Sequence, residues 1–405
     1  MKVNFSLLLV LAAGVFFGCE SANEELEEGI TGPQPVAKTN DMQVYMHYMP
    51  WYQGKETSGY WGSHWRMANK NPDNVDENGK REIASHYYPL IGPYDSRDPA
   101  VIEYHLLLMK YAGIDGVLID WYGTHNVHDY NPNLRSSNAL IENLDEVGLE
   151  FAIVYEEYTA ESVAAETSKT AIEAAKEDLA YMQANYFNKE EYIWIDEHPL
   201  LMTFGPRYFK QESQWNQILE GISPDPLFLP LWFHSHRVGA NGDGEFAWVD
   251  FNSSLSDLEG FYSQKEEHEL IIGSAFPRFH DFYKEGGWGE SYGRVYSNEG
   301  ETLRKTLRKA QEHDLDYIQL VTWNDFGEGT VIEPTLEDEY LFLEIIQEFT
   351  GVPYGRAELE LIYQYFLKKK ALQGNEEAEE KLEQVFQYLV TLKVEQAKEL
   401  LSQLP

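Results

Sequence analysis

Eight short apolar runs, most of them separated from the next by a helical pattern, constrain the fold of this 405-residue chain most strongly. The runs are apolar on both faces, which is typical of parallel strands buried between two layers. A strand–helix unit repeated eight times predicts an α/β fold, the (β/α)₈ TIM barrel. We expect the strands at residues 43–48, 115–121, 150–156, 199–204, 227–233, 246–251, 270–276 and 317–323.

The helical pattern at residues 98–112 is well defined, with Asp98 as the N-cap and Pro99 in the first turn. Further helices are expected at residues 137–147, 161–186, 211–219 and 302–313. A doubly wound open sheet is the alternative architecture. It is disfavoured because no Gly-rich dinucleotide loop follows the first strand.

The composition changes after the barrel, which we place at residues 41–355. Residues 357–404 contain no Trp and almost no Gly or Pro, and they carry three apolar stripes at helical spacing. We therefore expect a helical appendage at residues 356–405. About 50 residues bury little surface alone, so the appendage should rest on the barrel.

The amino terminus reads as a lipoprotein signal peptide at residues 1–18. Its apolar stretch, 5–17, is too short to span a bilayer, which needs ~20 residues. Cys19, the single cysteine, follows directly, so the segment resembles a bacterial lipobox with Cys19 as the lipidated residue. An ordinary signal peptide with a stray cysteine is the alternative.

An acidic tract at residues 20–28 follows Cys19. It resembles the surface-export signal of Bacteroidetes lipoproteins, although it also suits a solvated tether. We expect residues 19–40 to be a flexible tether and the protein to be an outer-membrane lipoprotein exposed at the cell surface.

The net charge of −37 repels phosphate backbones, so nucleic acid is not expected as a partner. The content of 27 Tyr, 20 Phe and 10 Trp excludes a wholly disordered chain. An acidic, aromatic-rich surface favours neutral ligands such as carbohydrates.

The reacting groups of a barrel lie at the carboxyl ends of its strands. Six of these ends carry an aromatic residue, most of them beside a carboxylate or a histidine, a pattern that suits stacking on sugar rings and bonding to their hydroxyls. At the third, one of Glu156 and Glu157 should face the site and the other should be solvated. The expected substrate-binding residues are Tyr48, Trp51, Tyr52, Asp120, Trp121, Tyr122, Glu156, Trp232, His234, Trp323 and Asn324.

The last strand leads into the segment 323–334, where Asp325 and Glu328 are three residues apart beside glycines. One carboxyl could protonate a leaving glycosidic oxygen while the other assists from the opposite side as nucleophile or base. A polar capping loop is the alternative interpretation.

These segments carry a family resemblance. The stretches 47–52, 92–99, 112–117, 120–123 and 323–334 resemble glycoside hydrolase family 99 and its relatives in family 71, in the same order along the chain. The resemblance implies a (β/α)₈ barrel and retaining, metal-independent cleavage inside α-mannose chains, without a cofactor.

By the same resemblance, Glu328 is the catalytic acid/base. The family has Glu where this chain has Asp325, and there the carboxylate deprotonates the sugar 2-hydroxyl, which attacks the anomeric carbon. The Trp323-Asn324-Asp325 sequence is closer to family 71, which cleaves α-1,3-glucan, so α-mannoside and α-glucan both remain open.

Other patterns are weaker. The histidines lack metal-ligand spacing, so no metal is expected. Residues 241–245 are better read as a turn than as a calcium loop. There is no Gly-x-Ser-x-Gly elbow for serine chemistry.

Three function classes follow. The first is a cell-surface endo-glycosidase acting on a poly- or oligosaccharide. The second is a non-catalytic glycan-binding lipoprotein on the same barrel. The third, glycosyl transfer in envelope synthesis, is disfavoured because nucleotide-sugar donors are cytoplasmic.

Overall fold

All eight expected strands are present in the computed structural model, which describes residues 32–405. They form one curled parallel sheet in the order β6-β5-β3-β2-β1-β11-β8-β7. The two ends of that order meet where Leu231 and Phe246 form a parallel bridge, so the sheet closes as a TIM-like barrel. The strands are β1 (Gln43–Tyr48), β2 (Gly116–Trp121), β3 (Glu150–Tyr155), β5 (His198–Thr203), β6 (Leu227–Pro230), β7 (Gly244–Phe246), β8 (Leu270–Ala275) and β11 (Tyr317–Leu320).

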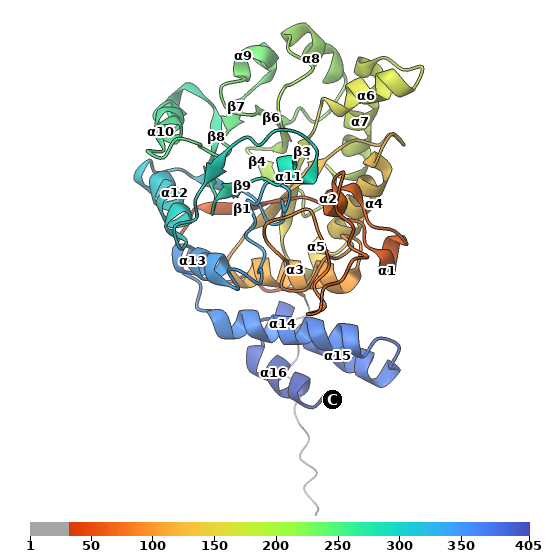
Figure 1. Cartoon of the computed structure of the whole chain (residues 1–405). Coiled ribbons are helices and arrows are strands. Elements are labelled where there is room, and N and C mark those ends of the chain that lie inside the picture. The colour runs from red at the N-terminus through yellow and green to blue at the C-terminus, as the bar shows by residue number, and fades with distance from the viewer. Residues whose placement is uncertain (1–31) are drawn as a thin grey trace, which may run out of the picture. The chain divides into compact units, whose positions relative to one another are not determined.

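Helices surround this sheet, as Figure 1 shows. Because the strands are covered on both faces, they are buried over nearly their whole length. The long helices around the barrel are α3 (Pro99–Tyr111), α4 (Tyr130–Ile141), α6 (Thr159–Glu166), α7 (Ala171–Asn185), α8 (Glu212–Ile218), α10 (Ser256–Tyr262), α12 (Glu301–Glu312) and α13 (Leu341–Thr350). Short helices are α1 (Lys55–Ser58), α2 (Ser63–Arg66), α5 (Leu144–Val147), α9 (Ser235–Val238) and α11 (Tyr283–Gly286).

The start of α3 matches its sequence prediction, since the Asp98 carboxylate accepts the Ala100 N–H at 3.0 Å. The expected helix 161–186 is instead two helices, α6 and α7. A new N-cap at Thr170 separates them, because Thr170 and Glu173 form a reciprocal capping box. The predicted strand 227–233 ends at Pro230, and Phe233 adopts a left-handed backbone conformation with φ 63°. The predicted strand 246–251 lies at Gly244–Phe246 instead, so it shares only Phe246 with the prediction.

The carboxyl-terminal helices α14 (Arg356–Ala371), α15 (Glu376–Val390) and α16 (Val394–Ser402) pack beside α3 (Figure 1). Glu103 of α3 accepts a hydrogen bond from the Tyr365 hydroxyl at 2.5 Å and pairs with Lys369, both of α14. The Tyr111 hydroxyl donates to the carbonyl of Leu389 at 2.9 Å. The appendage is therefore joined to the barrel by buried polar contacts as well as by apolar packing.

Residues 32–40 are held in place, which corrects the expectation of a free tether for this stretch. The Gln34 N–H donates to the carbonyl of Val390 at 2.9 Å, and Lys38 pairs with Asp115 at 2.5 Å. The signal peptide, Cys19 and the acidic tract lie outside the described residues.

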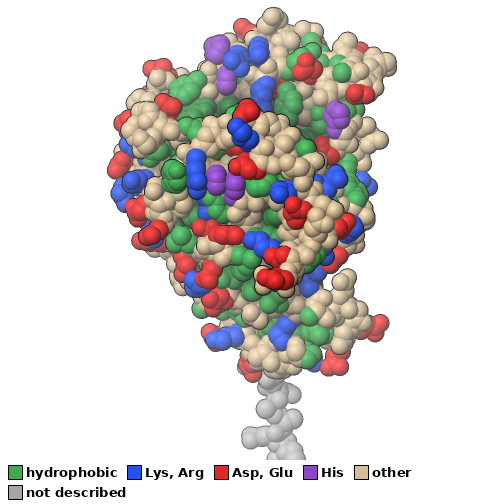
Figure 2. Space-filling view, viewed as in Figure 1, with side chains coloured by type: hydrophobic (Ala, Val, Ile, Leu, Met, Phe, Trp, Pro, Cys, Tyr) green, Lys and Arg blue, Asp and Glu red, His purple; other side chains and the backbone are tan. Residues whose placement is uncertain are grey.

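The surface carries both signs of charge despite the net charge of −37. Figure 2 shows acidic and basic side chains interspersed over the viewed face, with apolar side chains between them. Within residues 32–405, no helix is both long and apolar enough to cross a membrane.

Candidate active site

The loop after β11 is folded into a tight, buried turn. The Asp325 N–H donates to the Thr322 hydroxyl at 2.8 Å, and the Gly329 N–H donates to the Asp325 carbonyl at 2.8 Å. Gly329 has φ 69°, and a Cβ there would lie 2.6 Å from the carbonyl oxygen of His280. Only glycine fits this position. The glycine therefore allows the backbone of the turn that carries Asp325 and Glu328 to pass close to His280.

The two carboxyls of this turn line the same cavity. The main-chain N–H of Glu328 donates to Asp325 Oδ1 at 2.9 Å, and the Tyr283 hydroxyl donates to Glu328 Oε1 at 3.1 Å. Asp325 is buried, whereas Glu328 keeps partial exposure. Glu328 is thus the carboxyl that a group entering from solvent reaches first.

The environment pushes both acids toward protonation. Burial raises the pKa of Asp325 to about 6, against hydrogen bonds from the main chain and the charge of His64. Burial raises the pKa of Glu328 well above its ordinary value, and the neighbouring Asp325 charge raises it further. A pair whose members differ in this way can hold one protonated acid and one carboxylate together near neutral pH.

A second pair of carboxyls, Asp120 and Glu156, comes from the ends of β2 and β3. Burial raises the pKa of Glu156 to about 7, although the Arg207 charge opposes the shift. Burial and the Glu156 charge raise the pKa of Asp120 well above its ordinary value. Asp120 Oδ2 and Glu156 Oε2 are buried and bond no group among residues 32–405, so both are available to a polar ligand.

Aromatic rings form the side walls of the cavity, whose volume is about 190 Å³. Trp51 stacks on His64 with ring centroids 4.2 Å apart, and His64 meets Trp288 edge-on at 5.5 Å. Trp248 packs against His47 at 4.8 Å. The result is a small pocket with apolar faces and several carboxyls, which suits a hydroxyl-rich ring with apolar C–H faces.

Six of the predicted site residues line the cavity: Trp51, Asp120, Tyr122, Glu156, Asp325 and Glu328. The other seven do not line it, which differs from their expected placement: Tyr48, Tyr52, Trp121, Trp232, His234, Trp323 and Asn324.

The alternation of side chains along a strand explains why Tyr48 and Trp121 do not line the cavity. Tyr48 points outward to α3, where its hydroxyl meets His105 Nδ1 at 3.1 Å, while the preceding His47 lines the cavity. Trp121 points to Tyr181 of α7, while the preceding Asp120 faces inward. Successive strand residues face opposite sides, so only one of each pair reaches the site.

Asn324 and Tyr52 form hydrogen bonds that hold the turn of Asp325 and Glu328 in place. Asn324 Oδ1 accepts the Met49 N–H at 2.9 Å, and its amide nitrogen donates to the Met49 carbonyl at 3.0 Å. The Tyr52 hydroxyl donates to the Asn324 carbonyl at 2.9 Å and accepts the Phe326 N–H at 3.1 Å. These bonds tie the turn to the end of β1.

The remaining three residues, Trp323, Trp232 and His234, do not line the cavity either. Trp323 is buried with its ring 5.3 Å from that of His105. Trp232 stacks on Phe233 at 5.2 Å, and His234 follows in the loop leading to α9. Their type suggested sugar binding, but their neighbours are other core or loop residues.

Glu157 is buried rather than solvated, which corrects its predicted exposure. Its carboxylate accepts main-chain N–H groups of Arg207, of Tyr208 at 2.9 Å and of Phe209 at 3.1 Å. These bonds hold the loop after β5, so Glu157 places the Arg207 side chain beside Glu156.

Several cavity residues escaped the sequence analysis. Arg207 follows the end of β5, a strand end that could have been inspected like the others. Tyr283 and Trp288 come from the long connection after β8, where glycines hide any periodic pattern. Only the spatial arrangement identifies these two.

Within residues 32–405, no group of three or more His, Cys, Asp or Glu side chains is placed to hold a metal ion. In residues 241–245, which the sequence predicts to be a turn, Asp243 Oδ2 accepts the Phe228 N–H at 2.7 Å. That bond ties the segment to β6.

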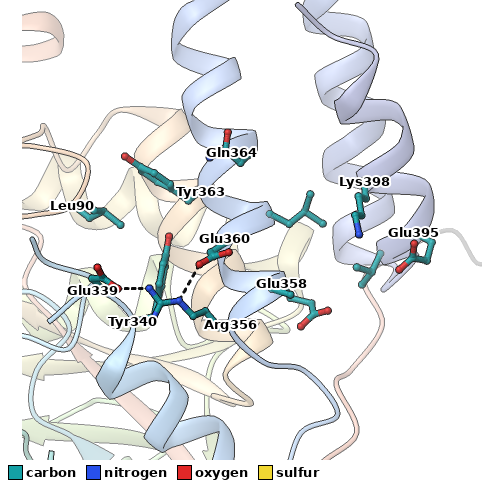
Figure 3. Close-up of a pocket in the computed structure, with 13 residues that line it drawn as sticks. Leu90, Glu339, Tyr340, Arg356, Glu358, Glu360, Tyr363, Gln364, Glu395 and Lys398 are labelled. Atoms are coloured by element: carbon teal, nitrogen blue, oxygen red, sulfur yellow. Dashed lines mark hydrogen bonds and ion pairs between the residues drawn. The ribbon is translucent and has the colours of Figure 1, made fainter. Parts of the chain in front are cut away.

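Another hollow, of about 460 Å³, lies between the appendage and the barrel (Figure 3). Its guanidinium, on Arg356, already pairs with Glu339 and with Glu360, the latter at 2.9 Å. Because the hollow lacks the paired carboxyls of raised pKa, it is a poor candidate for the reacting centre.

The mouth of the barrel joins two neighbouring carboxyls, aromatic walls and further buried carboxyls, which are the groups that glycoside hydrolysis uses. The profile of glycosyl hydrolase family 99 matches residues 39–224. The chain is therefore similar to the endo-α-mannosidases of glycosyl hydrolase family 99, and the matched segment is a little under half of its length.

Comparison with individual proteins gives the same similarity to endo-α-mannosidases. A glycoprotein endo-α-1,2-mannosidase-like protein of Danio rerio is 24% identical over 324 residues, covering 72% of this chain and 70% of the relative. The glycoprotein endo-α-1,2-mannosidase of Rattus norvegicus is 35% identical over 88 residues, which is 20% of this chain and 19% of that protein. The structure of the family 99 endo-α-mannosidase from Bacteroides thetaiotaomicron superposes with a TM-score of 0.61 at 20% identity, over 78% of this chain and 99% of that one, and so supports the fold.

Proposed function

We propose that the protein is an endo-acting, retaining glycosidase that cleaves chains of α-linked mannose. The mannosidase names of its relatives support the substrate class. One observation supports the chemistry above all: Asp325 and Glu328 share a single turn at the cavity, joined by a 2.9 Å hydrogen bond, with raised pKa values.

Glu328 acts as the general acid and then as the base. Its raised pKa favours the protonated carboxyl, and its partial exposure lets it reach the glycosidic oxygen. As the C–O bond breaks, the proton of Glu328 moves to the leaving sugar. In the second step the resulting carboxylate takes a proton from the incoming water.

Asp325 acts as a base on the sugar 2-hydroxyl. One of its oxygens is engaged by the Glu328 N–H, and its pKa of about 6 makes it a stronger base than an ordinary aspartate. Removal of the hydroxyl proton lets that oxygen attack the anomeric carbon and form a three-membered ring. Water later attacks the anomeric carbon and opens this ring, and the protonated Asp325 returns its proton to the 2-oxygen. Two inversions at the anomeric carbon give net retention.

Asp120, Glu156 and Arg207 bind the sugar hydroxyls. With raised pKa values, Asp120 and Glu156 can each donate or accept a hydrogen bond, while Arg207 only donates. Trp51 and Trp288 provide ring faces or edges for the apolar side of the sugar.

Product sizing tests the substrate class. The protein is incubated with a panel of α-mannans, α-glucans and host glycans, and the products are separated by length. Internal fragments from α-mannan alone are expected. Fragments from α-glucan alone would overturn the mannose assignment while keeping the glycosidase.

The location is proposed from sequence alone. Cys19 is lipidated and anchors the protein in the outer membrane, facing outward, where glycan-uptake proteins receive its products. The apolar stretch 5–17 and the acidic tract 20–28 on either side of the only cysteine support this arrangement.

A further inference from the structure

A row of exposed aromatic side chains leads away from the cavity. We define the aromatic strip as Trp288, Tyr292 and Phe251, which are 44%, 72% and 47% exposed. Trp288 lines the cavity, while Tyr292 and Phe251 lie outside it. Exposed rings grouped at the edge of a site commonly mark a binding surface.

The strip is continuous with the catalytic turn. Tyr283, whose hydroxyl bonds Glu328, meets Tyr292 edge-on with ring centroids 5.6 Å apart. Beyond Tyr292, a Cβ added to Gly293 would lie 3.7 Å from the Phe251 ring. The glycine thus leaves the chain close against Phe251.

The exposure of Tyr292 is built into the fold. The buried carboxylate of Asp281 accepts the Tyr292 N–H at 2.8 Å and the Ser291 hydroxyl at 2.9 Å. The segments on either side pair as the two-stranded ribbon β9 (Phe279–His280) and β10 (Arg294–Val295). Phe251 packs against Phe279 of this ribbon at 4.7 Å. The ribbon therefore holds both rings in place at the surface.

The size of the cavity indicates what the strip meets. At about 190 Å³ the cavity is smaller than the ~300–1,000 Å³ of typical drug-sized sites, and it has room for about one hexose ring. The remaining sugars of a chain must lie outside it. Sugar rings present apolar C–H faces, and aromatic rings are the side chains that offer matching flat apolar surfaces.

We propose that Tyr292 and Phe251 bind sugar residues of the same α-linked chain outside the cavity, so that the protein favours long chains over short ones. This inference rests on the proposed function and adds a second binding region to it.

Binding of oligosaccharides of different length tests the strip. The full chain carrying Glu328→Gln, which slows turnover strongly, is titrated calorimetrically with an α-linked disaccharide and hexasaccharide of mannose and of glucose. We expect the hexasaccharide to bind more tightly. Tyr292→Ala and Phe251→Ala should each weaken hexasaccharide binding about three- to tenfold, and disaccharide binding by less than about twofold.

Two further variants separate a binding role from a folding role. Tyr292→Phe keeps the ring and should retain hexasaccharide affinity. Trp194→Ala removes a ring that is 43% exposed on β4 (Trp194–Ile195), which pairs with the start of β5 at the opposite end of the barrel, and should change nothing.

Two results would overturn sugar binding by the aromatic strip while leaving the proposed function intact. One is equal affinity for both chain lengths, and the other is hexasaccharide binding that Tyr292→Ala and Phe251→Ala leave unchanged. No binding by any hexasaccharide overturns both. A change of oligomeric state in Tyr292→Ala, with sugar affinity unchanged, would instead identify the strip as a contact between copies of the chain and overturn the proposal.

Discussion

The main-chain N–H of Glu328 donates a 2.9 Å hydrogen bond to Oδ1 of Asp325. The bond joins the two catalytic candidates within one turn, and the charge of Asp325 raises the pKa of Glu328. A change at Asp325 therefore alters the protonation of Glu328. Variants of the two residues must be told apart by measurements that respond to one residue's role only.

Glu328→Gln keeps the size and hydrogen bonding of the side chain but removes its acidic proton. Turnover of a natural glycan should fall ~10²–10⁴-fold because general acid catalysis is lost. A substrate with a very good leaving group needs little protonation, so the first step should be partly restored, as stopped-flow release of that group would show. Glu220→Gln, at a surface carboxylate, is the matched control. An active Glu328→Gln on the natural glycan would contradict the assignment.

Asp325→Asn removes the base that deprotonates the sugar 2-hydroxyl. Turnover should again fall by ~10²–10⁴-fold, but here a good leaving group should give no rescue, because the attacking oxygen is not activated. A wild-type assay on a 2-deoxy substrate gives the complementary test, and no turnover is expected. Efficient cleavage of the 2-deoxy substrate would show direct attack by the Asp325 carboxylate instead.

The pH–rate profile should be bell-shaped. Activity needs Asp325 ionised and Glu328 protonated, so the acid limb should lie near the Asp325 pKa of about 6 and the alkaline limb above it, at the raised pKa of Glu328. Tyr283→Phe removes a hydrogen bond that stabilises the Glu328 carboxylate and should move the alkaline limb to higher pH. An alkaline limb that does not move, or moves down, would exclude Glu328 as the group it reports.

Stability should depend on pH through Glu156. Its folded pKa of about 7 lies above the ordinary value of 4.5, so the folded state binds more protons between these values. That contribution is complete below the unfolded pKa and is lost as pH rises through the folded one. Glu156→Gln should therefore be more stable than wild type at alkaline pH by on the order of 1–2 kcal/mol, reduced because Arg207 loses its partner. Thermal unfolding at acid and alkaline pH measures this, and a gain of equal size at both would contradict it.

Cys19→Ala should release the protein from the membrane fraction. The expected product is a soluble, fully active enzyme, since Cys19 precedes the barrel by more than twenty residues. Fractionation with activity assays checks this. Membrane retention of Cys19→Ala would refute lipid anchoring.

The barrel could be predicted from the sequence because its strands are buried on both faces and therefore read as continuous apolar runs. The end of β7 was less clear: the chain leaves the sheet after Phe246, but the residues that follow stay apolar. Local hydrophobicity marks burial, and it does not mark where pairing stops.

The shared position of Asp325 and Glu328 at one cavity could be predicted because both residues lie in one segment. The sequence did not show which of two adjacent strand residues faces the cavity. His47 and Asp120 face it, while Tyr48 and Trp121 face the helices. Strand alternation would have separated them once one inward residue was known. Trp288, in contrast, reaches the cavity only through tertiary folding of its loop.

The central claim is tested most directly by following the cleavage of an α-linked manno-hexasaccharide by proton NMR, with Asp325→Asn and Glu328→Gln in parallel. The account predicts internal cleavage in which the first-formed reducing end is the α-anomer, and loss of that signal in both variants. First appearance of the β-anomer, or undiminished cleavage by both variants, would contradict it.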